Sequence, residues 1–266
     1  MKVPRSPHPW SVTPRQAVAI QRKLAARVRQ TRPRNALRLI AGMDVAFTPD
    51  GRHSVAAVVV WDRKTRSVVE EKVATRRLRF PYVPGLLSFR EAPAVLAALR
   101  RLRQSPDALM CDGHGLAHPR RFGLACHIGI LCNLPTLGCA KQRLIGKHST
   151  PEATRGSRTA LKDRGQTIGT VLRTQDGVRP VFVSIGHKID TSTAEALVLD
   201  CAFRYRLPEP TRLADRLAAQ AKRRGVGSFT LPGSSPTPAE TAVPPLQHPG
   251  QGEIPPVRQG RRRLER

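Results

Sequence analysis

The sequence predicts a mixed α/β fold, with one sheet covered by helices on both faces. Three β-branched runs follow one another in the first third of the chain. After these runs in the chain, short apolar runs alternate with segments of helical period, and two more helical segments come last. Consecutive strands followed by alternating helices and strands are typical of a sheet that contains both antiparallel and parallel pairs.

The chain begins with a Pro-rich lead and one basic helix. Thr13 followed by Pro14 has the pattern of a helix N-cap and a first helical residue, and helix formers continue over 16–28. The next three runs are β-branched and joined by turn segments, so they predict an antiparallel meander. These runs cover 37–47, 54–61 and 67–74.

A second set of elements follows from Ser88, where a helical period starts that ends before Pro106. The run 107–112 is short and largely apolar, as expected of a strand covered on both faces. The remaining elements are predicted as a helix at 119–132, a strand at 135–140, a hairpin at 167–174 and 180–186, and helices at 191–203 and 209–222.

The composition changes near residue 222. Beyond it the chain holds eight prolines, few large apolar residues and a basic end, so it cannot bury enough surface to fold alone. We therefore predict one folded domain over 1–222 and a disordered, Pro-rich basic tail over 223–266. The tail is expected to add electrostatic affinity for nucleic acid.

The net charge of +27 arises from 46 Lys and Arg against 19 Asp and Glu. Such an excess favours a polyanionic partner, for which nucleic acid is the first candidate, although a bias in genomic base composition would also give an Arg-rich chain. No apolar run reaches the roughly 18 residues of a membrane span and the N-terminus lacks a signal-peptide pattern, so a cytoplasmic protein without a membrane partner is expected. A monomer is the default expectation.

The five cysteines form no C-x-x-C pair and lie mostly in apolar surroundings. They are interpreted as reduced core thiols, and no metal site is predicted from them. Cys126 and Cys132 with His127 would be zinc ligands only if they left the helical apolar pattern in which they fall.

Four acids lie in or beside the predicted core. Burying a carboxylate is costly unless it is paired or bound to a metal, so each of them needs a reason to be there. Asp44 lies inside the first strand, and Asp112 ends the strand 107–112, where ligands bind in open α/β sheets. Glu91 and Asp215 lie on predicted helices.

Each acid also has an ordinary structural interpretation. Asp44 would be a strand-edge residue or part of a capped turn, and Asp112 would form an Asx turn before a glycine. Glu91 would complete a capping box with Ser88. Asp215 would pair with Arg212 or Arg216 of its helix. Taken jointly, Asp44 and Asp112 would share one end of the sheet, where hard oxygen ligands suit Mg²⁺ and phosphodiester hydrolysis.

Four segments resemble endonuclease V, in the family's order and at plausible spacing. They are PYVPGLLSFRE (81–91), DGHGLAHPRRFGLA (112–125), GCAK (138–141) and YRLPEPTRLAD (205–215). The resemblance covers roughly residues 13–222. It implies an RNase H-like fold and a Mg²⁺-dependent DNA repair endonuclease that recognises deaminated adenine (hypoxanthine in deoxyinosine) by base flipping. It further implies hydrolysis of the second phosphodiester bond 3′ to the lesion, leaving 3′-hydroxyl and 5′-phosphate ends.

The same resemblance implies the roles of individual residues. The metal-binding acids are matched by Asp44, Asp112 and Glu91. The catalytic set is completed by His118, Lys141 and Asp215. For His118 the alternative is a loop histidine bonded to backbone, and for Lys141 a solvated lysine. Lys141 would otherwise offset the charge of the scissile phosphate. His114 is left unassigned.

The PYVP segment resembles the family's wedge, in which Tyr82 stacks into the gap left by the displaced base. The alternative is an exposed loop tyrosine between turn-forming prolines. Backbone groups near Gly85, Leu87 and Gly123 would line the pocket for the flipped base, although each glycine would serve equally in an ordinary turn. The predicted substrate-binding residues are Pro81, Tyr82, Pro84, Gly85, Leu87 and Gly123.

Two alternatives stay open beside the DNA repair endonuclease. The same pocket would read inosine in RNA, which makes an inosine-specific ribonuclease the first alternative. The second is a non-catalytic RNase H-like module that binds nucleic acid, although several acids facing phosphate would weaken simple binding.

Overall fold

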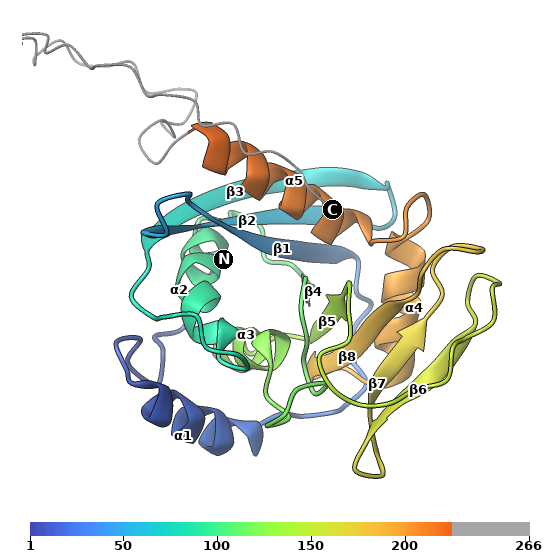
Figure 1. The fold of residues 1–266 in the computed structure, drawn as a ribbon. Helices are drawn as coiled ribbons and strands as arrows, with labels where there is room; N and C mark the ends of the chain where they lie inside the picture. The colour runs from blue at the N-terminus through green and yellow to red at the C-terminus, as the bar shows by residue number, and fades with distance from the viewer. Residues whose placement is uncertain (225–266) are drawn as a thin grey trace, which may run out of the picture. The chain divides into compact units, whose positions relative to one another are not determined.

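One mixed sheet of eight strands organises the part of the chain that the structure describes, residues 1–224 of a computed structural model (Figure 1). The strands are β1 (Leu39–Phe47), β2 (His53–Asp62), β3 (Ser67–Arg77), β4 (Ala108–Cys111), β5 (Thr136–Ala140), β6 (Arg158–Asp163), β7 (Gln166–Leu172) and β8 (Val181–His187). Their order in the sheet is β3-β2-β1-β4-β5-β8-β7-β6. The pairs β1–β4 and β4–β5 are parallel and all others are antiparallel, so the predicted mixed sheet is confirmed.

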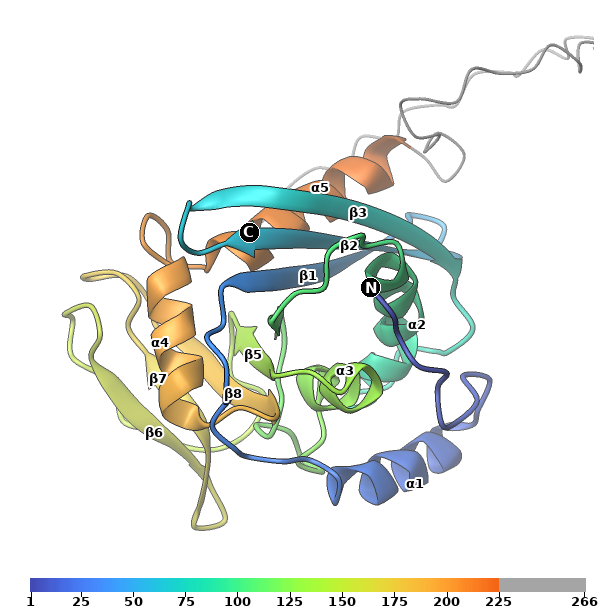
Figure 2. The same ribbon diagram turned by 180° about the vertical axis from the view of Figure 1, so that it is seen from behind.

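Helices cover both faces of this sheet, as Figures 1 and 2 show. They are α1 (Pro14–Ala25), α2 (Leu87–Arg100), α3 (Leu124–Cys132), α4 (Thr191–Cys201) and α5 (Glu209–Arg224). Alternate residues of β1 separate the two layers, because Met43 packs in a cluster with α2 and α3 whereas Ile40 packs with α4. The fold is RNase H-like with helices on both faces, as predicted.

Gly42 lets α5 cross the sheet at close range. A Cβ at this position would lie 2.1 Å from the backbone carbon of Pro210, so a larger residue would push the start of α5 away from β1. Further along, Ala218 and Ala221 of α5 pack against Val55 of β2. The helix therefore runs along β1 and β2, and Asp215 lies in its middle.

Most predicted strands are confirmed within three residues at each end, including the meander and the hairpin of β7 with β8, and Thr13 is the N-cap of α1 as predicted. Helices α1 and α2 end earlier than predicted, at Ala25 and Arg100. Three other differences have a physical reason. Strand β6 was missed because its sequence, RTALKD, is mostly polar and it lies at the sheet edge. The helix placed at 119–132 begins only at Leu124, since Arg121 has a φ of 53°.

The third correction concerns the capping box of Ser88 with Glu91. Helix α2 begins at Leu87, and its N-cap residue Leu86 makes no side-chain hydrogen bond. Ser88 Oγ instead lies 2.9 Å from His127 Nδ1 in the interior. The ordinary structural interpretation of Glu91 is therefore wrong, and its carboxylate needs another explanation.

The five cysteines are all free and buried, as predicted for core thiols. No helix in residues 1–224 has the length and apolar character needed to cross a membrane. The predicted tail lies, from residue 225 onward, outside the described residues.

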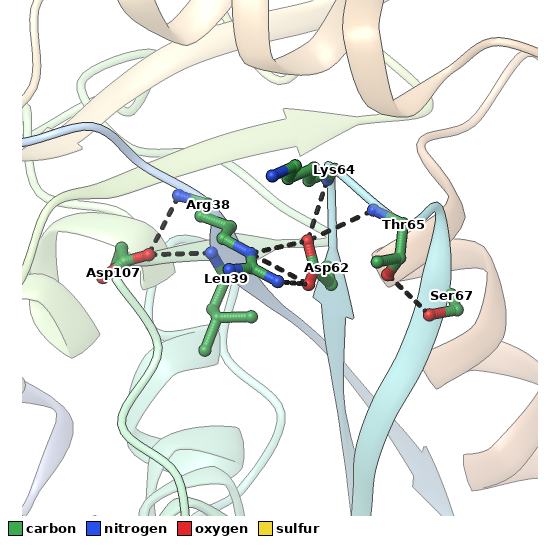
Figure 3. A network of polar contacts seen from close by, with 7 residues as sticks. All are labelled: Arg38, Leu39, Asp62, Lys64, Thr65, Ser67 and Asp107. Atoms are coloured by element: carbon green, nitrogen blue, oxygen red, sulfur yellow. Dashed lines mark hydrogen bonds and ion pairs between the residues drawn. The ribbon is translucent and has the colours of Figure 1, made fainter.

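Polar contacts fix the start of β1, at the end of that strand far from Asp44 (Figure 3). Asp107 Oδ2 accepts hydrogen bonds from the backbone N–H groups of Arg38 (2.9 Å) and Leu39 (2.8 Å). The Arg38 guanidinium in turn donates to both oxygens of Asp62, and this interaction holds the pKa of Asp62 at about 2. The network ties β1 to β2 and to the start of β4.

We expect Asp107→Ala to lower the free energy of unfolding by about 1–3 kcal/mol, because two backbone N–H groups lose their charged acceptor. Urea unfolding followed by circular dichroism measures this change. The catalytic rate of the folded variant should equal that of the original protein, since Asp107 lies at the opposite end of the parallel strands from Asp112. An unchanged unfolding midpoint would contradict the structural role of Asp107.

Candidate active site

Two acids lie at the same end of neighbouring parallel strands. The last paired residues of β1 and β4 are Met43 and Cys111, and each is followed directly by an aspartate, Asp44 and Asp112. The backbone N–H of Asp112 donates to the Met43 carbonyl at 3.3 Å, which keeps the two chains in register up to this point. The carboxyl ends of the parallel strands thus bring the two predicted acids to one edge.

Lys141 links Asp112, at the end of β4, to Asp215 on α5. It follows β5, and its Nζ lies 2.7 Å from Asp112 Oδ2 and 3.1 Å from Asp215 Oδ2. Arg212, which sequence reasoning allowed as a partner of Asp215, binds Glu209 instead. The alternatives of a solvated Lys141 and of an Arg212–Asp215 pair are therefore wrong. The structure brings three elements together through this lysine.

Burial and neighbouring charges raise the pKa of Asp44 and of Glu91. Burial raises the pKa of Asp44 to about 6, and the charges of Asp112 and Asp215 add to this rise. Burial, followed by the charges of Asp44 and Asp112, raises the pKa of Glu91 well above its usual range. Glu91, on α2, therefore faces the same cluster, and this residue is only 8% exposed. The single positive charge of Lys141 does not neutralise the four carboxyl groups of Asp44, Glu91, Asp112 and Asp215.

Lys141 itself stays charged. Its burial lowers the pKa, but the hydrogen bonds and charges of Asp112 and Asp215 outweigh this effect and hold the pKa above its usual value. A fixed ammonium group beside an acidic cluster is suited to a phosphate oxygen that approaches the same edge.

The donor set of this cluster suits a hard divalent cation. Carboxylate oxygens are the ligands such ions prefer. A cation would offset both the burial and the repulsion that raise the pKa values of Asp44 and Glu91. As the side chains stand, no group of three or more His, Cys, Asp or Glu residues within 1–224 is arranged to hold a metal ion. Asp44, Glu91 and Asp112 are thus gathered as a cluster without forming a closed ligand set.

A cavity of about 190 Å³ adjoins the acids. It is smaller than the roughly 300–1,000 Å³ pockets that hold drug-sized ligands, so its size suits a single base. Its wall includes Gly113 and His114, which directly follow Asp112, and Leu87 and Ser88 at the start of α2. The cavity and the acidic cluster therefore share the same loop and the same helix.

Five of the six predicted substrate-binding residues line this cavity, and Pro81 alone does not. The five are Tyr82, Pro84, Gly85, Leu87 and Gly123. Tyr82 is 70% exposed at its rim. At Gly123 a Cβ would lie 2.2 Å from the His114 carbonyl oxygen, so only glycine allows the two loop segments to approach this closely.

The comparisons with known proteins agree with this geometry. The family model described as endonuclease V matches residues 22–216. The endonuclease V of Roseiflexus castenholzii is 49% identical over 219 residues, covering 82% of this chain and 98% of that protein. The chain belongs to the endonuclease V family. It is thus an endonuclease, and the resemblance seen in its motifs is confirmed.

Solved structures of the family share its fold. The endonuclease V of Streptomyces avermitilis has a TM-score of 0.78 at 46% identity, covering 81% of this chain and 95% of that one. The protein of Bacillus subtilis has a TM-score of 0.80 at 31% identity, covering 84% and 98%. The chain therefore spans nearly the whole length of its relatives.

His118 of the family motif is turned toward the backbone. Its Nε2 lies 2.9 Å from the Gly85 carbonyl oxygen, and its Nδ1 accepts from the Arg120 N–H at 3.2 Å. Burial lowers the pKa of His118 to about 4, so the ring is neutral at pH 7 and Nε2 carries the proton. The alternative of a backbone-bonded loop histidine describes this geometry. His114, left unassigned, bonds the Gln142 carbonyl at 3.0 Å.

Among the residues that sequence reasoning did not single out, Gln21 and Arg120 bond the walls of the cavity. Gln21 is 1% exposed, lines the cavity and bonds both of its walls. A signal was present, because Gln21 lies four residues after Ala17 and three before Leu24 on the buried face of α1. A polar residue on an apolar helix face needs a buried partner.

Proposed function

We propose that this endonuclease V is a Mg²⁺-dependent DNA repair enzyme that takes a flipped hypoxanthine into the cavity and hydrolyses the second phosphodiester bond 3′ to it. The single observation that supports this best is the junction of a base-sized cavity with the acidic cluster along Asp112–Gly113 and the start of α2. When a base is held in the cavity, the nucleic-acid strand that carries it lies close to the carboxylates.

The cavity offers hydrogen-bond donors that suit hypoxanthine. Helices α2 and α3 both begin at its wall, and neither N-cap residue, Leu86 or Gly123, caps its helix with a side chain. The first N–H groups of a helix have no partner within the helix. Those of Phe89 and Ala125 donate to the Leu86 and His114 carbonyls, so a ligand acceptor would use the N–H groups of Leu87, Ser88 and Leu124 at the cavity wall. Hypoxanthine presents an oxygen acceptor where adenine presents an amino donor, and a wall of N–H groups favours the former.

A relative with the same fold binds nucleic acid of the proposed class, DNA that contains inosine. An endonuclease V of Ciona intestinalis was crystallised with DNA containing an inosine followed by a ribo-adenosine. That protein is 24% identical to this chain, so the proposal rests on the residues of this cavity, with the relative as an indication of ligand class.

In the proposed reaction Asp44 and Asp112 would hold the metal, with Glu91 as the third acid. The chemistry that Mg²⁺ would supply there is polarisation of the phosphoryl oxygen and activation of a water molecule. Lys141 donates from Nζ to a phosphate oxygen while Asp215 keeps the ammonium group in place. His118 holds the Gly85 carbonyl and thereby the pocket wall. The cut leaves 3′-hydroxyl and 5′-phosphate ends.

The deciding experiment uses an end-labelled duplex with a single deoxyinosine, the protein and Mg²⁺, and maps the cut by gel electrophoresis. We expect one nick, at the second phosphodiester 3′ to the lesion, and none in the matched adenine duplex. A parallel RNA oligonucleotide with one inosine separates the ribonuclease alternative by its rate. Binding to the oligonucleotides without any nick would favour the non-catalytic alternative.

Tyr82 is proposed as the wedge that fills the gap left by the flipped base. We expect Tyr82→Ala to weaken binding of the deoxyinosine duplex by about 5–150-fold, the equivalent of the roughly 1–3 kcal/mol that one base–aromatic stack contributes. Tyr82→Phe keeps the ring and should bind nearly as the original protein does. Fluorescence anisotropy in Ca²⁺ measures both. Equal affinity of the Ala and Phe variants would contradict the stacking role.

A further inference from the structure

The carbonyl oxygen of Gly85 is the most heavily bonded acceptor at the cavity. It accepts hydrogen bonds from Gln21 Nε2 at 3.0 Å, His118 Nε2 at 2.9 Å and Arg120 Nη2 at 2.6 Å. A carbonyl has two lone pairs, so three donors leave it no capacity for a ligand. Its role is to fix the PYVPG loop in place.

Gln21 connects this loop to the opposite wall. Its Nε2 also donates to the Phe122 carbonyl at 3.1 Å. Gly85 lies two residues before the first residue of α2, and Phe122 lies two before the first residue of α3. One side-chain amide therefore holds the approaches to both helices whose first turns line the cavity.

The orientation of the amide follows from its third contact. Arg120 Nε donates to Gln21 Oε1 at 2.5 Å, and a guanidinium can only donate. The acceptor end of the amide must therefore face Arg120, which leaves the NH₂ end for the two carbonyls. Because Gln21 is almost fully buried, water does not replace these bonds if the side chain is removed.

We propose that Gln21 is a positioning residue for base recognition: it holds the two walls of the cavity at a fixed separation and so places the N–H groups that read the flipped base. Arg120 supports it by locking the amide. This inference rests on the proposed function for its consequence in catalysis, whereas the clamping of the two walls concerns the free protein.

Gln21→Met tests the clamp, because methionine has a similar length and no hydrogen-bond donor. Hydrogen–deuterium exchange of the free protein is expected to rise at least about tenfold in segments 81–86 and 114–123, with α4 and α5 unchanged. Gln30→Met is the matched control, since Gln30 is exposed and lies beyond the end of α1. Exchange in both segments equal to that of the control would overturn the proposal.

Kinetics on the deoxyinosine duplex give a second measurement. We expect the KM of Gln21→Met to rise about tenfold, the effect of one or two lost hydrogen bonds, with kcat changed far less, because Gln21 bonds no member of the acidic cluster. The ratio of kcat/KM for the inosine substrate to that for the adenosine substrate should fall as well. A loss in kcat at unchanged KM would overturn the positioning role in recognition.

Two further outcomes remain distinguishable. If Gln21→Met does not fold, Arg120→Lys keeps the charge and removes the planar fork, and it should loosen the same two segments. If the original protein cuts no inosine substrate, the proposed function fails, while the exchange measurement still decides whether Gln21 clamps the walls.

Discussion

Asp112→Asn is expected to slow cleavage of the deoxyinosine duplex by at least about 100-fold, the size of effect that follows loss of one electrostatic group in an active site. The substitution keeps the shape of the side chain and removes its charge. Asp112 lies beside Asp44 where β1 and β4 stop pairing and bonds Lys141, so the change removes one carboxylate oxygen of the proposed metal site and one anchor of the lysine together. Binding of the duplex should persist, because the cavity and Tyr82 are untouched.

Single-turnover rates at saturating enzyme, combined with anisotropy titrations in Ca²⁺, measure cleavage and binding separately. Asp176→Asn provides the matched control, since Asp176 is an exposed acid between β7 and β8. It should cut at the original rate. An Asp112→Asn protein that cuts as fast as this control would remove the acidic cluster from the mechanism.

The sheet was predictable from the sequence where its strands are covered, and unpredictable where they are exposed. The runs that became β1, β2 and β4 are apolar because both of their faces are packed, and such runs are readily recognised. Strand β6 lies at the sheet edge, most of its residues are polar and only Leu161 is buried, so its sequence resembles a loop. Its pairing with β7 comes from tertiary context.

Asp44 and Asp112 were predictable because each is a costly carboxylate in or directly after an apolar strand, and the family motifs added Glu91 and Asp215. The pairing of these acids was not predictable. Lys141 and Asp215 are 74 residues apart and meet because α5 packs on β1 at Gly42, a close approach that no local pattern encodes. The orientation of His118 toward Gly85 depends likewise on how two distant loops meet. Motif resemblance supplied the residue types, and the packing of the loops supplied their contacts.

Asp44→Asn is expected to abolish cleavage and yet to stabilise the metal-free protein at neutral pH. An acid whose pKa rises from 3.8 in the unfolded chain to about 6 in the folded one holds its proton more tightly when folded. The wild-type fold therefore loses stability as pH rises through this window, and the loss is complete above it. Asparagine keeps the acceptor for the Val45 N–H without the charge.

At pH 7.5 in EDTA we expect the variant to unfold with a free energy about 2 kcal/mol higher than wild type, after allowance for partial solvent screening of Asp44. At pH 3.5 the two proteins should differ little, because the carboxyl group is then mostly protonated in the folded state. Urea titrations at both pH values measure this. Mg²⁺ should stabilise wild type more than Asp44→Asn, since a cation relieves the repulsion that the substitution has already removed. Equal stability at pH 7.5 would mean that the acids at this sheet edge do not oppose folding, and the electrostatic reason for a metal there would be lost.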